Sequence, residues 1–209
     1  MPRPAPTVAV FDLGNVLIDW NPRHLYRKLF GGDAAAMERF LATVCTQAWN
    51  EQQDAGRSFV EAVEELCVAH GDKRALIEAW HRRFDEMMAG PIEGTVDILT
   101  ALRTRGVPLY ALSNWSAETY PVAERRFDFL SWFDGVLISG REGIKKPDPR
   151  IFTLLLDRFG LQPDAAVYID DSPRNVAAAE ACGIRAVHFD GPVSGPLAVR
   201  RALGAMGLL

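Results

Sequence analysis

The sequence predicts an α/β protein, a parallel sheet covered by helices and interrupted early in the chain by a helical segment. After residue 91, apolar strand-like runs alternate with runs of helical periodicity, which is typical of parallel sheets. Between residues 20 and 90, helical spacing dominates and strand signals are few. We therefore expect a core of residues 1–19 and 91–209 and a separate helical domain of residues 20–90.

The first strand is expected at residues 7–11, a short β-branched apolar run that a glycine turn at Gly14 ends. In the helical segment, apolar residues recur at helical spacing, for example at Leu76, Trp80 and Phe84.

Beyond residue 91, helices and strands are expected to alternate. Helices are expected at 94–105, 117–127, 149–159, 173–182 and 196–206, and strands at 107–112, 135–138, 165–169 and 186–189.

Composition narrows the expected partners and compartment. The chain has 27 acidic and 23 basic residues, a net charge of −4, whereas nucleic-acid binders usually carry a basic surplus. No apolar run reaches the ~18 residues that a membrane helix needs, and Asp12 breaks the N-terminal apolar run of a would-be signal peptide. Three cysteines without CxxC spacing are typical of a reducing compartment. We expect a cytoplasmic protein with no nucleic-acid or membrane partner, either a monomer or a homodimer.

Polar residues follow several of the predicted strands. In parallel sheets, ligands bind at the carboxyl ends of the strands, so these residues are the candidate site. They are Asp12 after the first strand, Ser113 and Asn114 after the second, Lys145 and Lys146 after the third, and Asp170 and Asp171 after the fourth.

Three carboxylates at one sheet edge repel one another unless a cation is present. Oxygen-rich sites of this kind suit Mg²⁺, which also binds phosphate. Each acid has a simpler interpretation, since Asp12 fits a turn, and the pair Asp170 and Asp171 fits a helix start before Pro173. Helix capping and metal binding are compatible for the acidic pair.

The remaining strand-end residues suit an anionic ligand. A hydroxyl at Ser113 and an amide at Asn114 can hold phosphate oxygens, although both also suit a helix cap. One of the two adjacent lysines, Lys145 or Lys146, can neutralise the charge, and the spacing does not choose between them. Asn175, in the first turn after the acidic pair, indicates by itself only an exposed polar residue.

The ordered set resembles the haloacid dehalogenase (HAD) superfamily of hydrolases. The residues that carry the resemblance are Phe11-Asp-Leu-Gly-Asn-Val-Leu17, Leu112-Ser-Asn114, Lys146-Pro-Asp-Pro-Arg-Ile-Phe152 and Tyr168-Ile-Asp-Asp-Ser-Pro-Arg-Asn-Val176. The resemblance implies a Rossmann-like core with a small helical cap of the C1 type inserted after the first strand. Within the superfamily, the sequence is similar to bacterial sugar-phosphate phosphatases that begin Asp-Leu-Gly-Asn-Val, among them glucose-1-phosphate phosphatases.

The resemblance also implies a mechanism and a set of site residues. Asp12 would attack the phosphorus of a small phosphate ester and form an aspartyl-phosphate. Mg²⁺ would be held by Asp12, the backbone carbonyl of Gly14, Asp170 and Asp171. Ser113, Asn114 and Lys146 would bind the phosphoryl oxygens.

One departure from the family pattern concerns the proton donor. Most phosphatases of the superfamily carry a second aspartate two residues after the nucleophile, as general acid and base, and this chain has Gly14 there. A good leaving group, a water molecule or a cap residue would have to serve instead.

Cap residues should choose the substrate. Trp49, Glu51, Gln52 and Asp54 form a polar and aromatic stretch of the helical segment, and Trp115 directly follows Asn114. Each tryptophan either lines the substrate pocket or packs in a core.

Two other functions stay open at this level. A 2-haloacid dehalogenase also uses an aspartate nucleophile but needs no metal, and Gly14 is compatible with it. The pair Asp170 and Asp171 argues against it, because their charge would repel a carboxylate substrate. A non-catalytic phosphate-binding or regulatory protein on the same fold is the other alternative.

Overall fold

The computed structural model describes residues 4–209 and contains a five-stranded parallel sheet. The strands follow the order β5-β4-β1-β6-β7 across the sheet. Their bounds are β1 Val8–Phe11, β4 Leu109–Ser113, β5 Gly135–Ile138, β6 Ala166–Asp170 and β7 Arg185–His188. The first strand therefore lies at the centre of the sheet, between β4 and β6, as its fully apolar composition requires.

Successive residues of the central strands face opposite sides of the sheet. Ala9 and Phe11 pack in one core cluster and Val10 in the other. The first cluster receives Leu99 of α6 (Glu93–Thr104) and Leu203 of α11 (Gly191–Ala205).

The opposite face is covered by two helices. Its cluster contains Phe152 of α9 (Pro149–Phe159) and Ala179 of α10 (Pro173–Ala181). The sheet is thus a three-layer α/β structure, which confirms the predicted fold class.

Sequence signals set where these helices begin and end. Asp148 caps α9 by accepting the backbone N–H of Arg150 at 2.9 Å, and Pro149 occupies the first helical position. Gly160 ends the same helix in the left-handed region, with φ of 63°.

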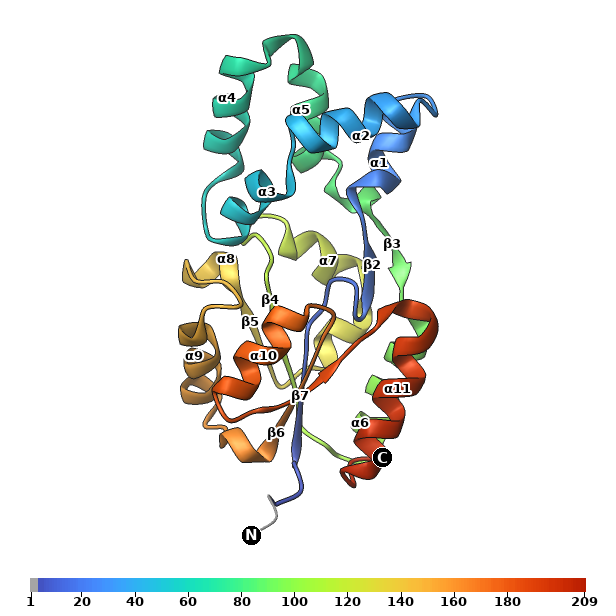
Figure 1. The fold of residues 1–209 in the computed structure, drawn as a ribbon, viewed down its shortest axis with the longest axis vertical. Coiled ribbons are helices and arrows are strands. Elements are labelled where there is room, and N and C mark those ends of the chain that lie inside the picture. Colours follow the sequence, from blue (N-terminus) through green and yellow to red (C-terminus); the bar gives the residue numbers. More distant parts are fainter. Residues whose placement is uncertain (1–3) are drawn as a thin grey trace.

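A second, antiparallel sheet leads out of the core and back. It pairs β2 (Ile18–Trp20) with β3 (Met88–Pro91). The residues between them form α1 Pro22–Leu29, α2 Ala34–Thr43, α3 Gln47–Asp54, α4 Phe59–Ala69 and α5 Arg74–Arg82, with short 3₁₀ turns at Gly71–Lys73 and Phe84–Met87. We call α1–α5 the inserted helices. They lie beyond the carboxyl ends of the parallel strands (Figure 1).

The structure differs from the sequence prediction in three places. The ribbon of β2 and β3 was not expected, because two short strands carry little periodic signal. Helix α11 begins at Gly191 rather than near residue 196, with Pro196 inside it. The helix expected at 117–127 is shortened to α7 (Tyr120–Arg126). The division of the chain into domains at residues 20 and 90 stays a prediction.

The remaining elements connect the layers. They are the short helix α8 (Ser139–Glu142) and the 3₁₀ turns Asp128–Trp132 and Pro163–Ala165. Cys45 and Cys67 are buried and Cys182 is partly exposed, and all three are free thiols. Within residues 4–209, the longest helices are too short or too polar to cross a membrane.

Candidate active site

The ends of the three central strands bring together side chains that are far apart in the sequence. Asp12 directly follows β1, Ser113 ends β4 and Asp170 ends β6. The Ser113 hydroxyl donates a hydrogen bond of 2.7 Å to Asp12 Oδ1, which also accepts the backbone N–H of Leu13 at 2.7 Å. One carboxylate oxygen of Asp12 is therefore held by the sheet itself, and its residue is only 7% exposed.

Lys146 lies between the two buried aspartates. Its Nζ is 3.0 Å from Asp12 Oδ1 and 2.7 Å from Asp170 Oδ2, and it donates to the Leu112 carbonyl at 2.9 Å. The residue is only 1% exposed. Although burial lowers the pKa of Lys146, the charges of Asp12 and Asp170 outweigh it and raise the pKa above its ordinary value. The lysine is therefore a fixed positive charge at neutral pH.

The loop that carries Lys146 is held by Asn114. The Asn114 side chain accepts the backbone N–H of Lys146 at 2.8 Å and donates to its carbonyl at 2.9 Å. One amide hydrogen of Asn114 is left for a ligand. The side chain of Lys146 is buried beside Asp12 and Asp170, whereas that of Lys145 lies at the rim of the cavity.

Asp12, Asp170 and Asp171 form a cluster of carboxylates. One oxygen of each lies within 4.8 Å of the others. Burial raises the pKa of Asp12 to about 7, with the Asp170 and Asp171 charges acting in the same direction and Lys146 opposing them. Burial and the neighbouring Asp170 raise the pKa of Asp171. One lysine thus leaves the cluster with an excess of negative charge.

Asp170 is the most fully bonded member of the cluster. Its Oδ1 accepts the backbone N–H of Ser172 at 2.7 Å and the amide of Asn175 at 3.0 Å, and its Oδ2 contacts the Tyr168 hydroxyl. Burial favours the neutral acid, but Lys146 and these donors hold the pKa of Asp170 below its ordinary value. It therefore stays an anion beside Lys146.

Two of these partners escaped the sequence analysis. Asn175 was expected to be an exposed polar residue, yet it is buried and bonded to Asp170. Tyr168 was quoted only as part of a motif. It lies two residues before Asp170 on β6, and the alternation of a strand places both side chains on one face. That spacing was the available signal for Tyr168. Asn175 belongs to the same quoted motif, but its position gave no signal that it would be buried.

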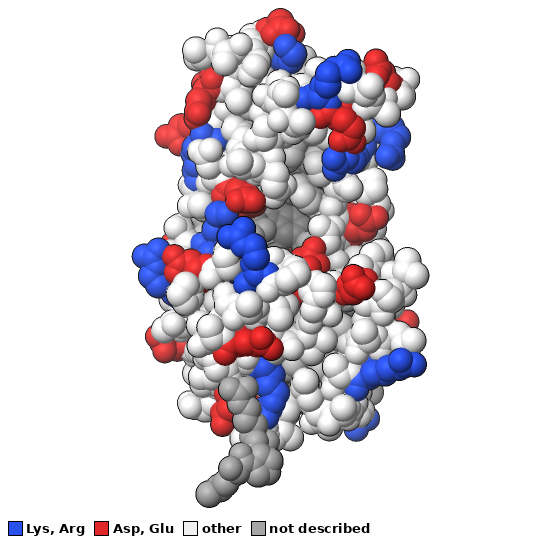
Figure 2. Space-filling view, viewed as in Figure 1, with Lys and Arg blue, Asp and Glu red and all other residues white. Residues whose placement is uncertain are grey.

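A cavity of about 310 Å³ opens above these residues, between the sheet and the inserted helices. The molecule is hollowed at this level, with acidic and basic residues at the rim (Figure 2). The strand-end side contributes Asp12, Gly14, Asn15, Ser113, Asn114, Trp115, Lys145, Lys146, Pro147, Asp171, Ser172, Arg174 and Asn175. The inserted side contributes Trp20, Phe84 and four polar residues of α3, Gln47, Asn50, Glu51 and Asp54. These four have the spacing of one helix face.

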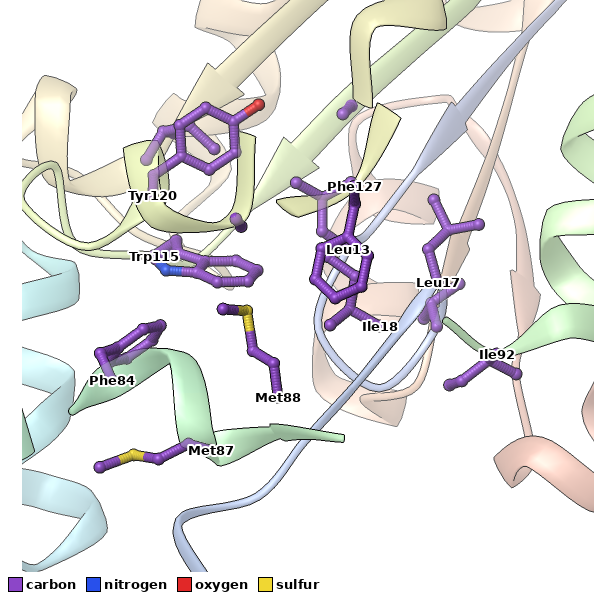
Figure 3. Close-up of a cluster of buried hydrophobic side chains, with 14 of the residues drawn as sticks. Leu13, Leu17, Ile18, Phe84, Met87, Met88, Ile92, Trp115, Tyr120 and Phe127 are labelled. Atoms are coloured by element: carbon purple, nitrogen blue, oxygen red, sulfur yellow. The ribbon is translucent and has the colours of Figure 1, made fainter. Parts of the chain in front are cut away.

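Aromatic and apolar side chains close the junction beside the cavity. Phe84, from the segment that returns to the core, lies with its ring centroid 6.0 Å from that of Trp115 (Figure 3). The Trp115 indole N–H donates to the Thr119 hydroxyl at 3.1 Å. Trp115 thus both packs and lines the cavity.

Of the two alternatives for Trp49, lining the substrate pocket or packing in a core, the structure has core packing. Its ring packs against Trp80 with centroids 5.4 Å apart, and its indole N–H donates to the Ala62 carbonyl at 3.2 Å. Trp49 belongs to the core of the inserted helices, because it lies on the face of α3 opposite to the cavity. Gln52 is exposed and lies outside the cavity lining. Trp20 and Phe84 are the aromatic residues that the insertion contributes.

Lys145 takes a different position from its neighbour. Its Nζ lies 2.7 Å from Glu51 Oε2, so an ion pair joins the core to α3 at the rim of the cavity. Both side chains are partly exposed, which screens the pair.

Several of the curated proteins to which this chain is similar are phosphatases. A sesquiterpene phosphatase of Aspergillus oryzae is 25% identical over 198 residues, 94% of this chain and 96% of that protein. A phosphoserine phosphatase of Thermus thermophilus is 36% identical over 136 residues, 64% of this chain and 53% of that protein, so the match spans about half of that relative's length. A phosphorylated carbohydrates phosphatase of Thermotoga maritima is 24% identical over 181 residues, 86% of this chain and 82% of that protein.

Solved structures share the fold. An HAD-like family hydrolase of Porphyromonas gingivalis has a TM-score of 0.73 and 26% identity, covering 95% of this chain and 98% of that one. An HAD family enzyme of Bacteroides thetaiotaomicron, solved with magnesium and inorganic phosphate, has a TM-score of 0.65 and 22% identity, covering 88% and 93%. A family model of haloacid dehalogenase-like hydrolases matches residues 6–183. The chain belongs to the haloacid dehalogenase-like hydrolase family.

Proposed function

We propose that this protein is a Mg²⁺-dependent phosphatase that hydrolyses a small phosphomonoester, with sugar phosphates as the substrate class, through an aspartyl-phosphate on Asp12. The observation that carries the proposal is the cluster of Asp12, Asp170 and Asp171 with one buried lysine, of which Asp12, Asp171 and Lys146 line a cavity. The phosphatase relatives support the same reaction class.

Asp12 has the geometry of a positioned nucleophile. Its Oδ1 is held by Leu13, Ser113 and Lys146, while Oδ2 accepts no hydrogen bond from residues 4–209. In the proposed reaction, a carboxylate oxygen of Asp12 attacks phosphorus as the ester P–O bond breaks. Lys146 neutralises charge on the phosphoryl oxygens, and Ser113 and Asn114 orient them. Water then cleaves the aspartyl-phosphate.

The donor set fits Mg²⁺. Three carboxylates within 4.8 Å supply oxygen ligands. Burial first, and then the neighbouring carboxylates, raise the pKa values of Asp12 and Asp171, and a divalent cation would favour their charged forms. Asp12, Asp170, Asp171 and the backbone carbonyl of Gly14 would hold the ion. When bound, it would supply charge neutralisation for the carboxylates and the phosphate. The magnesium and phosphate in the Bacteroides enzyme support this choice of ion.

The cavity supports a small hydroxylated substrate. Gln47, Asn50 and Glu51 offer donors and acceptors to hydroxyl groups, while Trp20 and Phe84 offer an apolar surface. Sugars present both kinds of surface. The phosphorylated carbohydrates phosphatase among the relatives supports this class, and the phosphoserine and sesquiterpene phosphatases set the competing substrates for the test.

The test is release of inorganic phosphate from p-nitrophenyl phosphate and from a panel of sugar phosphates, phosphoserine, phosphoglycolate and prenyl phosphates. We expect turnover with Mg²⁺, none with EDTA, and a loss of ~10⁴-fold or more in Asp12→Asn, because the nucleophile is removed. The control is Asp72→Asn, an exposed aspartate of the insertion outside the cavity. Turnover that neither EDTA nor Asp12→Asn reduces would contradict the proposal.

The same preparation tests the two alternatives. Halide release from a 2-haloacid in EDTA would indicate a dehalogenase instead. A folded protein that neither hydrolyses any ester of the panel nor binds BeF₃⁻ with Mg²⁺ would favour a non-catalytic protein.

A further inference from the structure

A fourth carboxylate faces the cavity from the inserted helices. Asp54, the last residue of α3, is 9% exposed and lines the same cavity as Asp12. It is not part of the cluster of three acids at the strand ends. The mechanism above gives this buried acid no role.

Hydrogen bonds fix one side of the Asp54 carboxylate. Its Oδ2 accepts the amide of Asn50 at 3.1 Å, and the Asn50 carbonyl oxygen accepts the Trp80 indole N–H at 3.1 Å. Because Trp80 can only donate, it sets the orientation of the Asn50 amide, which must then donate to Asp54.

The backbone of Asp54 is tied to the core. Its carbonyl accepts the Ser139 hydroxyl at 2.5 Å, and Ser139 Oγ accepts the backbone N–H of Trp115 at 3.0 Å. Gly56 continues this close approach, since a Cβ there would lie 3.3 Å from the Gly140 carbonyl. Helix α3 accordingly lies beside α8 (Figure 1). Asp54 is therefore positioned by the core although the insertion carries it.

The neighbourhood of Asp12 leaves room for a group from outside the first strand. Gly14 has no side chain, and a Cβ at this position would meet no atom within 4 Å. Gly14 and Asp54 line the same cavity. The space above the nucleophile is thus open toward α3.

The charges around Asp54 favour a carboxyl group that can hold a proton near neutral pH. Burial raises the pKa of Asp54 to about 7, with Glu51 and Asp12 acting in the same direction, while Lys145 and the backbone amide of Ser116 oppose them. A general acid works best when its pKa is close to the working pH.

We propose that Asp54 is the general acid and base of the reaction, in the role that Gly14 cannot fill. The inference rests on the proposed function. As Asp12 attacks phosphorus, the ester P–O bond breaks and the Asp54 carboxyl gives its proton to the leaving alcohol oxygen. The Asp54 carboxylate then takes a proton from the water that attacks the aspartyl-phosphate, which releases phosphate and restores both aspartates.

The experiment separates the two chemical steps with two leaving groups. p-Nitrophenolate leaves without a proton at neutral pH, whereas the alcohol of a sugar phosphate needs one. In rapid-quench measurements with Mg²⁺, Asp54→Asn should form phosphoenzyme from p-nitrophenyl phosphate at a rate within ~3-fold of wild type. Phosphoenzyme formation from the best sugar phosphate of the panel should slow by ~10²–10⁴-fold. Hydrolysis of the phosphoenzyme should slow as well, so that it accumulates.

The comparison of substrates within one variant makes the result independent of folding yield. The size of the p-nitrophenol burst counts active sites, and a partly misfolded preparation lowers both signals equally. Asp54→Glu keeps an ionisable proton and should recover part of the sugar-phosphate rate. Asp72→Asn, also an aspartate of the insertion, should match wild type with both substrates.

Equal slowing with both substrates, or no slowing with either, would overturn the role of Asp54. If wild type shows Mg²⁺-dependent turnover, such a result with Asp54→Asn leaves the phosphatase proposal intact. A wild-type chain without Mg²⁺-dependent turnover would instead overturn the proposed function and this inference together.

Discussion

The two sides of the cavity are built in different ways: the strand ends form its floor, and helix α3 forms its roof. On the floor, the ends of adjacent strands hold Asp12 and Asp170, and Lys146 bonds to both. On the roof, the eight-residue helix α3 carries the polar residues, held to the core by the Ser139 contact and the pair of Lys145 with Glu51. Sheet register leaves the floor little freedom, whereas one short helix can change its side chains without disturbing the sheet. The position of the floor residues is therefore fixed by the sheet, whereas the position of the roof residues, Asp54 among them, depends on how α3 is held against the core.

The comparison is tested most strongly by the two adjacent lysines. Lys146→Met leaves Asp12 and Asp170 without their buried partner, so we expect a loss of ~3–5 kcal/mol in the free energy of unfolding. Activity should fall by ~10²-fold or more. Lys145→Met removes only a partly exposed pair and should cost ~1 kcal/mol or less. Urea unfolding and kcat/KM measure both effects, and equal effects of the two variants would contradict the distinction between the buried lysine of the floor and the lysine that pairs with the roof at the rim.

The pH dependence sharpens the assignment of Asp54. Its carboxyl must hold a proton to protonate an alcohol, and its pKa is raised to about 7. Phosphoenzyme formation from a sugar phosphate should therefore fall ~10-fold per pH unit above this pKa. Phosphoenzyme formation from p-nitrophenyl phosphate should show no such fall at high pH. In Asp54→Asn, phosphoenzyme formation from either substrate should show none. Identical pH profiles of the two substrates in wild type would argue against it.

Asp54 should also lower stability. Its folded pKa of about 7 lies above the ordinary value of 3.8, so between these values the folded state holds a proton that the unfolded chain has lost. The stability that this bound proton contributes is fully present below pH 3.8 and is lost as the pH rises to about 7. Asp54→Asn lacks this loss, so it should be more stable than wild type by ~1–3 kcal/mol at pH 8, with a smaller difference at pH 5. Urea unfolding in EDTA at pH 5 and pH 8 measures this difference in the free energy of unfolding. The same difference between variant and wild type at both pH values would contradict the raised pKa of Asp54.

The smallest effect is expected at the rim. Glu51→Gln removes the charge that pairs with Lys145, both partly exposed, so the free energy of unfolding should change by less than ~1 kcal/mol. Because Glu51 lines the cavity, KM for the best substrate should change by a few-fold while kcat stays within ~2-fold. A large fall in kcat would show that Glu51 takes part in the chemical step, which would contradict this prediction.

Strand-end residues were accessible to sequence reasoning. Asp12, Ser113 and Asp170 each follow a short apolar run, and the carboxyl ends of parallel strands meet at one edge whatever the details of packing. Lys146 follows a longer loop after β5, and its strand-end position alone did not distinguish it from Lys145. The family resemblance indicated Lys146, and the structure buries it beside Asp12 and Asp170. The roles of these residues in catalysis stay predictions until the experiments above are done.

The inserted side was harder to predict. Trp49 and Asp54 belong to one helix, and the sequence placed both in a polar and aromatic stretch without deciding which faces the cavity. A helix of eight residues has a weak periodic signal, so its orientation depends on its neighbours. Trp80 and Ala62 take Trp49 into the core of the insertion, while Ser139 draws Asp54 toward the site.

By itself, the sequence determined the alternation of strands and helices, the early helical insertion and the polar strand ends, because these follow from local periodicity and from the geometry of parallel sheets. Only the tertiary structure decided which lysine is buried, that Asn175 bonds to Asp170, and that Asp54 rather than Trp49 faces the cavity. Each of these depends on contacts between segments distant in the sequence. Burial and hydrogen bonding across such contacts set the charge and direction of a side chain, and no local pattern records them.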